Sequence, residues 1–307
     1  MNKVSVVVCT YTEEMVDFVL SCLRSLRRQT LQPYEIILVL DPNETLVNFY
    51  KSKIPDGVKI VVGEGFGLFF ARNAGVKNSK GDIVAFIDDD AVADKHWLEN
   101  LVKNYSDPHV VGVGGIIKPL WQISRPLWFP EELYWVLGCS YKGLPEHKAS
   151  VRNPIGCNMS FRKSVFEKIG YFSSDIGRFG KKLLSCEETE LSIRALGKIQ
   201  GSKIVYDPLA VVHHRIGKSR ASLKYVLARS FYEGVSKALV TFKSNSSTIS
   251  STEEPYLKYL LKSAVPSRLK RIYRFENLSQ LLVLFLSAFT VITAFLLTRF
   301  GGVVEKQ

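Results

Sequence analysis

The chain has 307 residues, of which 46% are hydrophobic and 23% charged, and its formal net charge is +12. This composition excludes an intrinsically disordered chain, because the apolar fraction is large enough to form a core. Five cysteines, spread from Cys9 to Cys186, exclude a disulfide-rich scaffold and indicate a reduced setting. The length fits one large α/β domain with a smaller segment. The charge alone leaves nucleic acid, an anionic membrane or an acidic ligand open as partner.

The first ninety residues alternate between predicted strands and helices. Runs rich in β-branched residues predict four strands, at residues 4–9, 34–40, 58–62 and 82–87. Apolar residues at helical spacing predict a helix over residues 16–28, and a glycine-rich loop at 63–67 leads into a helix that contains Arg72. Short connections between alternating strands and helices predict an α/β fold with a doubly wound, mostly parallel sheet and flanking helices.

Polar residues stand at the carboxyl ends of these predicted strands. Thr10 and Tyr11 follow the first strand, Asp41 follows the second, and an aspartate triplet at 88–90 follows the fourth. Ligands of open α/β sheets bind in the crevice at the carboxyl ends of the strands. The sequence therefore predicts a ligand site at this edge of the sheet.

The triplet Asp88, Asp89 and Asp90 predicts a metal site. Three adjacent carboxylates at the end of a buried strand repel one another unless a cation neutralises them. Mg²⁺ or Mn²⁺ typically takes one or two carboxylates together with phosphate oxygens. The alternative is an acidic turn that caps a helix at 93–101, but a cap needs a single aspartate.

Arg72 is a candidate phosphate ligand. Gly63, Gly65 and Gly67 do not complete a dinucleotide-binding fingerprint, because Phe70 occupies the last glycine position. The loop instead allows a sharp turn that would point Arg72 into the cleft, where it could pair with phosphate or with the aspartates. An ordinary surface arginine fits this position equally well.

Two later segments hold further titratable groups. A helix that starts after Cys186 carries Glu187, Glu188 and Glu190 in its first turn, where acids either balance the helix dipole or include a general base. His213 and His214 follow a predicted strand at 210–212. These histidines could contact a metal ion or a diphosphate. The alternative is that they are ordinary buried histidines with satisfied hydrogen bonds.

The basic charge is concentrated near the C-terminus. Residues 215–274 contain thirteen Lys and Arg against three acids, so this segment carries +10 of the net charge. An uncharged stretch at 278–297 follows, long enough to span a bilayer as a helix, although a buried core helix is the alternative. The positive-inside rule then predicts a cytoplasmic body and a single-pass anchor in the cell membrane.

The segments before that stretch are predicted to associate with the membrane. Residues 220–242 read as an amphipathic helix, 244–254 as a polar linker, and 256–275 as a basic segment on the anionic leaflet. The predicted domains are a catalytic body, a basic membrane-associated segment, a transmembrane helix and a short tail, at residues 1–215, 216–277, 278–297 and 298–307.

With these motifs in order, the chain resembles the family 2 glycosyltransferases of the GT-A type. The matching segments are 4–11, 71–75, 81–90, 158–162, 170–172 and 187–194. The resemblance implies that Thr10, Tyr11 and Asp41 contact the nucleoside of a sugar donor. It gives Asp88 and Asp90 the role of the family's DxD motif toward the diphosphate and a metal ion.

The resemblance also assigns the remaining site residues. Glu188 occupies the position of the catalytic base, where the family more often has aspartate, so Glu187 and Glu190 are neighbours to test. The implied contacts to the nucleotide sugar further include Glu13, Arg72 and Asp89. The implied ligands of Mg²⁺ or Mn²⁺ are Asp88, Asp90, His213 and His214. Acceptor contacts are expected from Trp128, Trp135, Asn158, Ser160 and Glu187.

Two stretches, 128–139 and 231–237, are similar to archaeal glucosyl-dolichyl phosphate glucuronosyltransferases. We therefore expect an inverting transferase that moves a hexose or hexuronic acid from a UDP-linked donor. Its acceptor would be a polyprenyl- or dolichyl-phosphate-linked sugar, in glycan assembly such as protein N-glycosylation. The alternatives are an exopolysaccharide or cell-wall transferase and a non-catalytic membrane scaffold. A nucleic-acid partner is not expected, because it would leave the aspartates and the apolar stretch unexplained.

Overall fold

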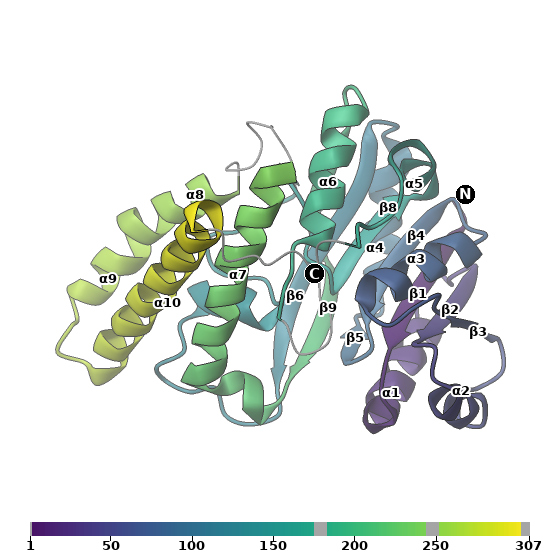
Figure 1. Cartoon of the computed structure of the whole chain (residues 1–307), viewed down its shortest axis with the longest axis horizontal. Helices are drawn as coiled ribbons and strands as arrows, with labels where there is room; N and C mark the ends of the chain where they lie inside the picture. Colours follow the sequence, from purple (N-terminus) through teal and green to yellow (C-terminus); the bar gives the residue numbers. More distant parts are fainter. Residues whose placement is uncertain (1, 175–182, 244–251, 302–307) are drawn as a thin grey trace.

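The computed structural model describes residues 2–174, 183–243 and 252–301. Its centre is a sheet with the strand order β3-β2-β1-β4-β8-β6-β9-β5, to which β7 adds beside β9 (Figure 1). The strands are β1 Val4–Thr10, β2 Glu35–Leu40, β3 Val58–Val62, β4 Ile83–Asp88, β5 Ala91–Ala93, β6 Val110–Trp121, β7 Ala149–Val151, β8 Asn158–Arg162 and β9 Lys203–Ile216. The four strands predicted in the first ninety residues correspond to β1 to β4.

The sheet is parallel in its first half and mixed in its second. β1 pairs in parallel with β2 and β4, and β2 pairs in parallel with β3. β8 runs antiparallel to both β4 and β6, while β9 is parallel to β6. The predicted α/β class with flanking helices is confirmed, and the doubly wound parallel part is confined to the strands that precede the aspartate triplet.

Helices cover both faces of the sheet. They are α1 Val16–Arg27, α2 Glu44–Lys51, α3 Leu68–Asn78, α4 Trp97–Val102, α5 Lys163–Ile169 and α6 Glu187–Lys198. α1, α2 and α4 pack on one face, and α3, α5 and α6 on the other. Val6 and Val8 of β1 enter the first core and Val7 enters the second, because successive side chains of a strand point to opposite faces.

The segment after the aspartate triplet differs from the prediction. Ala91–Ala93 forms β5, antiparallel to β9, and the helix expected from residue 93 begins only at Trp97. The small residues of this segment are buried and extend the sheet, a pairing with a strand 120 residues later that local sequence does not reveal. The triplet therefore lies in a turn between two strands, which excludes the helix-cap alternative.

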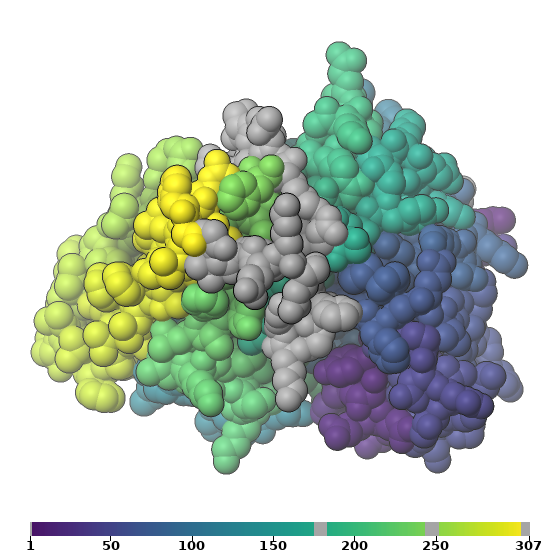
Figure 2. Space-filling view, viewed as in Figure 1, coloured from purple at the N-terminus to yellow at the C-terminus, as the bar shows by residue number. Residues whose placement is uncertain are grey.

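The C-terminal helices form a layer beyond the sheet, at the end of the molecule remote from β3 (Figures 1 and 2). They are α7 Leu223–Lys243, α8 Glu253–Tyr259, α9 Val265–Leu269 and α10 Phe275–Phe300. α10 lies along α7: Ser230 and Ser287 hydrogen-bond at 2.8 Å, and a Cβ atom on Gly234 would lie 2.8 Å from Cβ of Ala294. Small residues allow this close approach of two helix backbones.

α10 is long and apolar enough to cross a membrane, and it contains the stretch predicted at 278–297. One stripe of the helix packs against the protein, and the opposite stripe is exposed and apolar. The exposed side chains are Leu278, Leu282, Phe285, Phe289, Ile292 and Leu296. β9 ends one residue beyond the predicted domain boundary at 215. Residues 244–251 of the predicted linker and 302–307 of the predicted tail lie outside the described residues.

Candidate active site

A cavity of about 540 Å³ opens at the carboxyl ends of the central strands. Its polar end is lined by Arg72 from α3, Asp88 from β4, Glu187 and Glu188 from α6, and His214 from β9. The cavity thus brings together residues that lie more than a hundred positions apart in the sequence. It coincides with the ligand edge expected for an open α/β sheet.

Asp90 is held by two cations. Its carboxylate lies 3.0 Å from Nε2 of His214 and 3.4 Å from the guanidinium of Arg220. Burial alone would lower the pKa of His214, but the Asp90 carboxylate raises it to about 10. The proton on His214 and the charge of Arg220 therefore balance Asp90.

The donor atoms at this edge suit a hard divalent cation. Ligand atoms of Asp88, Cys157 and His214 all lie within 4.8 Å of one another, and Asp90 adjoins His214. Thiolate sulfur suits softer metals than Mg²⁺ or Mn²⁺, so Cys157 is a poor match for these ions. The carboxylates that remain match the oxygen ligands of Mg²⁺ or Mn²⁺, and His214 adds a nitrogen ligand once a bound cation displaces its proton.

His213 is not part of this group. It alternates with His214 along β9 and so points to the other face of the sheet, where Lys118 and Asp94 are its charged neighbours. Burial and Lys118 lower the pKa of His213. The structure therefore does not place His213 beside Asp88 or Asp90, as the sequence led us to expect.

Two buried polar side chains meet at the predicted nucleoside site. Among the described residues, Oγ1 of Thr10 and Oδ2 of Asp89 have no partner of good hydrogen-bond geometry, but the Thr10 side chain lies close enough to the Asp89 carboxylate to offset part of the rise in its pKa. Burial, with the adjacent Asp90 carboxylate, raises the pKa of Asp89 to about 7.

The other predicted nucleoside contacts surround this point. Tyr11 is 72% exposed at the end of β1, and Glu13 begins the short 3-10 turn that follows. The hydroxyl of Tyr50 donates to the carbonyl of Thr12 at 2.9 Å and so fixes this loop. Burial raises the pKa of Asp41 at the end of β2, an effect that the nearby Gly67 backbone partly offsets.

Arg72 is a buried arginine at the centre of the site. Only 3% of it is exposed, and its guanidinium donates to Glu187 at 2.8 Å and lies 4.0 Å from Asp88. It also donates to the carbonyl of Gly156. The surface alternative is therefore excluded. Arg72 joins the aspartate turn to the start of α6.

Glu188 differs from both of its acidic neighbours. Glu187 is paired with Arg72, and Glu190 is bound at 2.7 and 2.8 Å by Arg194. No basic side chain of the described residues lies within ion-pairing distance of Glu188, although it lines the cavity. Burial, followed by the Glu187 charge, raises the pKa of Glu188 to about 8. A carboxylate with a pKa near neutral pH suits a general base.

The backbone before Glu188 is unusual. Cys186 has φ 75°, the left-handed region that a side chain rarely adopts, and it is the sole such non-glycine residue in the described ranges. This turn starts α6 at Glu187, so that the first turn of the helix faces the cavity. Strained backbone of this kind is often found at functional sites.

The predicted acceptor contacts separate into two groups. Trp135 and Glu187 line the cavity, whereas Trp128 packs beside Phe129 outside its lining. Asn158 is fully buried: it accepts from the indole of Trp97 at 2.8 Å and donates to two backbone carbonyls. Ser160 is likewise buried and bonds the Tyr105 hydroxyl. Asn158 and Ser160 therefore brace the sheet behind the cavity and do not line it.

Several cavity residues were not among the predicted site residues. Arg220 precedes α7, and Arg229, Glu233 and Lys237 lie on one face of α7. Their spacing of four residues was visible in the sequence and did indicate a shared helix face. Nothing in the sequence showed that this face meets the cavity instead of the lipid surface.

Comparison with known proteins identifies the class. Residues 5–170 match the family model described as glycosyl transferase family 2, and the chain belongs to this family. The chain is 35% identical over 282 residues to the glucosyl-dolichyl phosphate glucuronosyltransferase of Haloferax volcanii, covering 91% of this chain and 89% of the relative. The predicted family and the predicted resemblance to archaeal glucosyl-dolichyl phosphate glucuronosyltransferases are thus confirmed.

More distant proteins share the fold. The succinoglycan biosynthesis protein ExoM of Rhizobium meliloti is 25% identical, covering 74% of this chain and 71% of the relative. The mannosyltransferase PcManGT of Pyrobaculum calidifontis, solved with GDP-Man and Mn²⁺, superposes with a TM-score of 0.61 at 16% identity, covering 98% of this chain and 88% of that one. GalNAc-T7, solved with UDP, GalNAc and Mn²⁺, gives a TM-score of 0.53 at 17% identity, with 86% and 56% covered. These likenesses confirm the GT-A fold.

Proposed function

We propose that the protein transfers a hexose or hexuronic acid, with inversion, from a UDP-linked donor to a sugar on a polyprenyl or dolichyl phosphate. The reaction would serve glycan assembly such as protein N-glycosylation. One observation carries this proposal: a single cavity has Asp88, Arg72 and Glu188 at one end and apolar side chains of α10 at the other. A lipid-linked acceptor needs both a reactive end and an apolar wall. The name of the Haloferax relative supports the same acceptor class.

The residues of the polar end divide the chemistry among them. Glu188 would take the proton of the acceptor hydroxyl, whose oxygen then forms the bond to the anomeric carbon as the bond to the diphosphate breaks. Arg220, 3.4 Å from Asp90, is placed to receive negative charge on the leaving diphosphate. Attack from the side opposite the leaving group inverts the anomeric centre.

Asp88, Asp90 and His214 would hold the Mg²⁺ or Mn²⁺ ion. When bound, such an ion would screen the charge that develops on the leaving group. Thr10, at the end of β1, and Asp89, in the turn after β4, would bind the nucleoside and hold the donor in place. Arg72 would hold Glu187 away from Glu188 and so leave Glu188 available as the base.

We also propose that α10 anchors the chain in the cell membrane, with the body in the cytoplasm. The exposed stripe of α10 supplies the apolar face, and Lys262, Lys270, Arg271 and Arg274 on the preceding segment are exposed toward anionic lipid. The single-pass topology stays the prediction of the charge distribution. α7 contacts α10 from Ser287 near its middle to Arg299 near its end, where Arg299 lies over the Phe242 ring. Because α7 covers one side of α10 along this length, the packing also fits an α10 that lies in the plane of the membrane.

Labelling of the tail distinguishes these two arrangements. In intact cells, a Gln307→Cys variant is labelled by a membrane-impermeant maleimide if the helix crosses the membrane. It stays unlabelled until the cells are opened if α10 lies in the plane. A soluble-fraction location of the full chain would contradict both.

The catalytic proposal is tested with a panel of nucleotide sugars and lipid-linked acceptors. Full-length protein should transfer sugar from one UDP-linked donor to a polyprenyl-phosphate-linked glucose only with Mn²⁺ or Mg²⁺. Asp90→Ala should abolish transfer, and Asp17→Asn, an exposed aspartate on α1, should not change it. An exopolysaccharide or cell-wall transferase is indicated instead if only acceptors without a polyprenyl phosphate are used. Absence of metal-dependent turnover with every donor would refute the transferase.

A further inference from the structure

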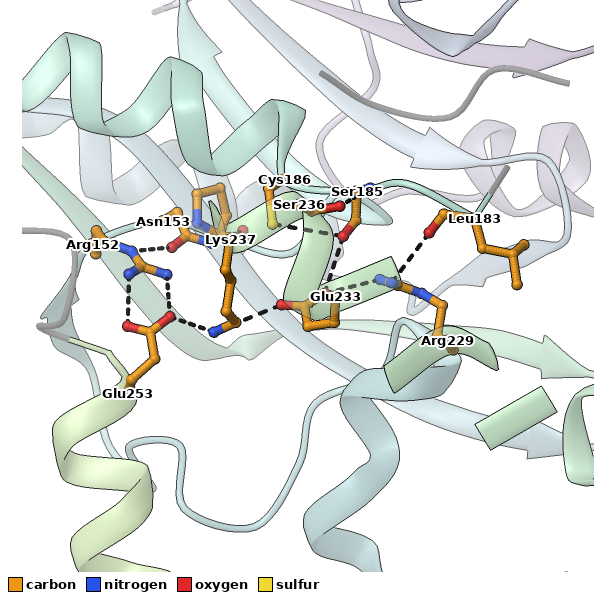
Figure 3. Close-up of polar contacts among 11 residues, drawn as sticks. Arg152, Asn153, Leu183, Ser185, Cys186, Arg229, Glu233, Ser236, Lys237 and Glu253 are labelled. Carbon is orange, nitrogen blue, oxygen red and sulfur yellow. Dashed lines mark hydrogen bonds and ion pairs between the residues drawn. The ribbon is translucent and has the colours of Figure 1, made fainter. Parts of the chain in front are cut away.

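The far side of the cavity holds a second charged group, which we name the headgroup cluster: Arg152, Arg229, Glu233, Lys237 and Glu253. Figure 3 shows these side chains joined in one row of polar contacts. Arg229 lies 3.3 Å from Glu233, and Lys237 lies 3.7 Å from Glu233 and 2.5 Å from Glu253. Glu253 also receives two bonds from Arg152, at 2.7 and 3.1 Å.

These charges are partly buried, and all of them line the cavity. Less than a tenth of the Arg229 side chain is exposed, and less than a third of each of the other four. Burial alone would raise the pKa of Glu233, but Lys237 and Arg229 lower it, so the cluster is charged at neutral pH. Burying charges is costly even when they are paired, and purely structural contacts are commonly made by apolar residues at lower cost.

The position of the cluster indicates its ligand. The lining includes Glu188 and, from α10, Leu284, Val291 and Phe295. α7 contacts both sides: Glu233 accepts from Ser185, three residues before Glu188, at 3.0 Å, and the next residue, Gly234, lies against Val291 of α10. An acceptor whose sugar reaches Glu188 and whose hydrocarbon chain follows α10 must carry its phosphate between the two. Arg229 and Lys237 occupy that intermediate place.

We propose that Arg229 and Lys237, with Arg152, bind the phosphate that links the acceptor sugar to its lipid. This inference rests on the lipid-linked acceptor of the proposed function. Glu233 and Glu253 hold the cations in position, and phosphate oxygens take over these contacts when the acceptor enters. Arginine and lysine are the usual phosphate ligands because their bonds to phosphate are charge-assisted.

The alternative is a structural network that only ties α7 and α8 to the body. Such a network would lose stability when a cation is removed, but it would not distinguish a phosphate-bearing lipid from a neutral one. The experiment therefore measures discrimination between two lipids, which loss of stability alone does not change.

Binding of farnesyl phosphate, farnesol and inorganic phosphate to the full-length protein in detergent is the direct test. Farnesyl phosphate should bind more tightly than farnesol. Lys237→Gln and Arg229→Gln should each weaken farnesyl phosphate about ten- to one hundredfold, the range for a hydrogen bond to a charged group, without affecting farnesol. Lys237→Arg should retain most of the affinity. Lys198→Gln, the same charge change at an exposed site on α6, should retain all of it.

Protection by Mn²⁺ with UDP serves as the check that each variant is folded. The proposal is overturned if farnesol binds as well as farnesyl phosphate, or if both glutamine variants keep the discrimination. It is also overturned if inorganic phosphate alone reproduces the effect, which would indicate a free-phosphate site, or if the variants weaken UDP instead, which would assign the cluster to the donor.

A transfer assay separates this inference from the proposed function. With farnesyl-phosphate-linked glucose as acceptor, Lys237→Gln should raise the acceptor KM by the same factor and leave the donor KM unchanged. If wild-type protein binds farnesyl phosphate as described but transfers no sugar, the phosphate site stands and the proposed reaction fails. If transfer occurs and the acceptor KM of both variants is unchanged, the reaction stands and the site fails.

Discussion

The raised pKa of Glu188 makes the pH dependence of transfer the sharpest test of the site. With a pKa of about 8, roughly a tenth of Glu188 is ionised at pH 7 and a hundredth at pH 6. A general base acts in its ionised form, so kcat/KM should rise about tenfold per pH unit from pH 6 and level off above pH 8. Glu188→Gln should lower the rate about 10²- to 10⁴-fold and should also abolish this rise of kcat/KM between pH 6 and pH 8.

The raised pKa of Glu188 also makes the stability of the fold depend on pH. Stability should fall as the pH rises, whereas activity should increase. Because the folded pKa lies above the unfolded value of 4.5, the native state favours protonated Glu188. Stability therefore falls as the pH rises from about 4.5 to about 8, by at most about 1.4 kcal/mol per pH unit. Replacement by glutamine removes this loss, so the Tm advantage of Glu188→Gln over the wild type should grow with pH.

The assay is a series of initial rates between pH 5.5 and 9.5 at saturating metal, with Tm measured in the same buffers. Glu190→Gln is the matched control: it breaks the bond to Arg194 and should lower Tm while keeping the pH limb. A wild-type kcat/KM that is already level at pH 6 would refute the raised pKa. Retention of more than a tenth of the activity in Glu188→Gln would refute its role as the base.

Two further predictions concern the C-terminal helices. Gly234→Leu should lower the free energy of unfolding by about 1–3 kcal/mol, because its Cβ would overlap the backbone of α10 at Val291. Gly197→Ala, whose added Cβ meets nothing within 4 Å, should raise it by about 0.4–1 kcal/mol. Chemical denaturation measures both changes. Phe285→Lys with Phe289→Lys, on exposed rings of α10, should move the protein from the membrane to the soluble fraction without lowering Tm. A protein that stays in the membrane fraction would show that another surface anchors it.

Local sequence was sufficient for the first four strands and for the polar residues at their carboxyl ends. The β-branched run at Val4–Thr10 and the polar residues directly after it specify a buried strand and its functional end, because both signals lie within ten residues. The position of the aspartate triplet at the end of β4 follows from the same pattern.

Long-range partners could not be predicted in this way. The pair of Arg72 and Glu187 joins residues 115 positions apart, and no periodicity in either segment indicates the other. Likewise, the spacing of Arg229, Glu233 and Lys237 identified one face of a helix but not what lies opposite that face. Both depend on how the sheet places distant helices side by side, which is a property of tertiary packing.

The packing of α7 and α10 against the sheet has a consequence for the length of the product. Val226 of α7 and Val283 and Leu284 of α10 belong to the same hydrophobic core as β1 and β9, so these helices pack directly onto the sheet that carries the site. In the proposed arrangement, α10 lies in the membrane and Glu188 is the base. The height of the base above the lipid surface is then fixed by the fold. A membrane-tethered glycan presents only the hydroxyl that reaches this height, and each added sugar carries the new end beyond it. Under the proposed function, the enzyme would therefore extend its lipid carrier by one sugar and then release it.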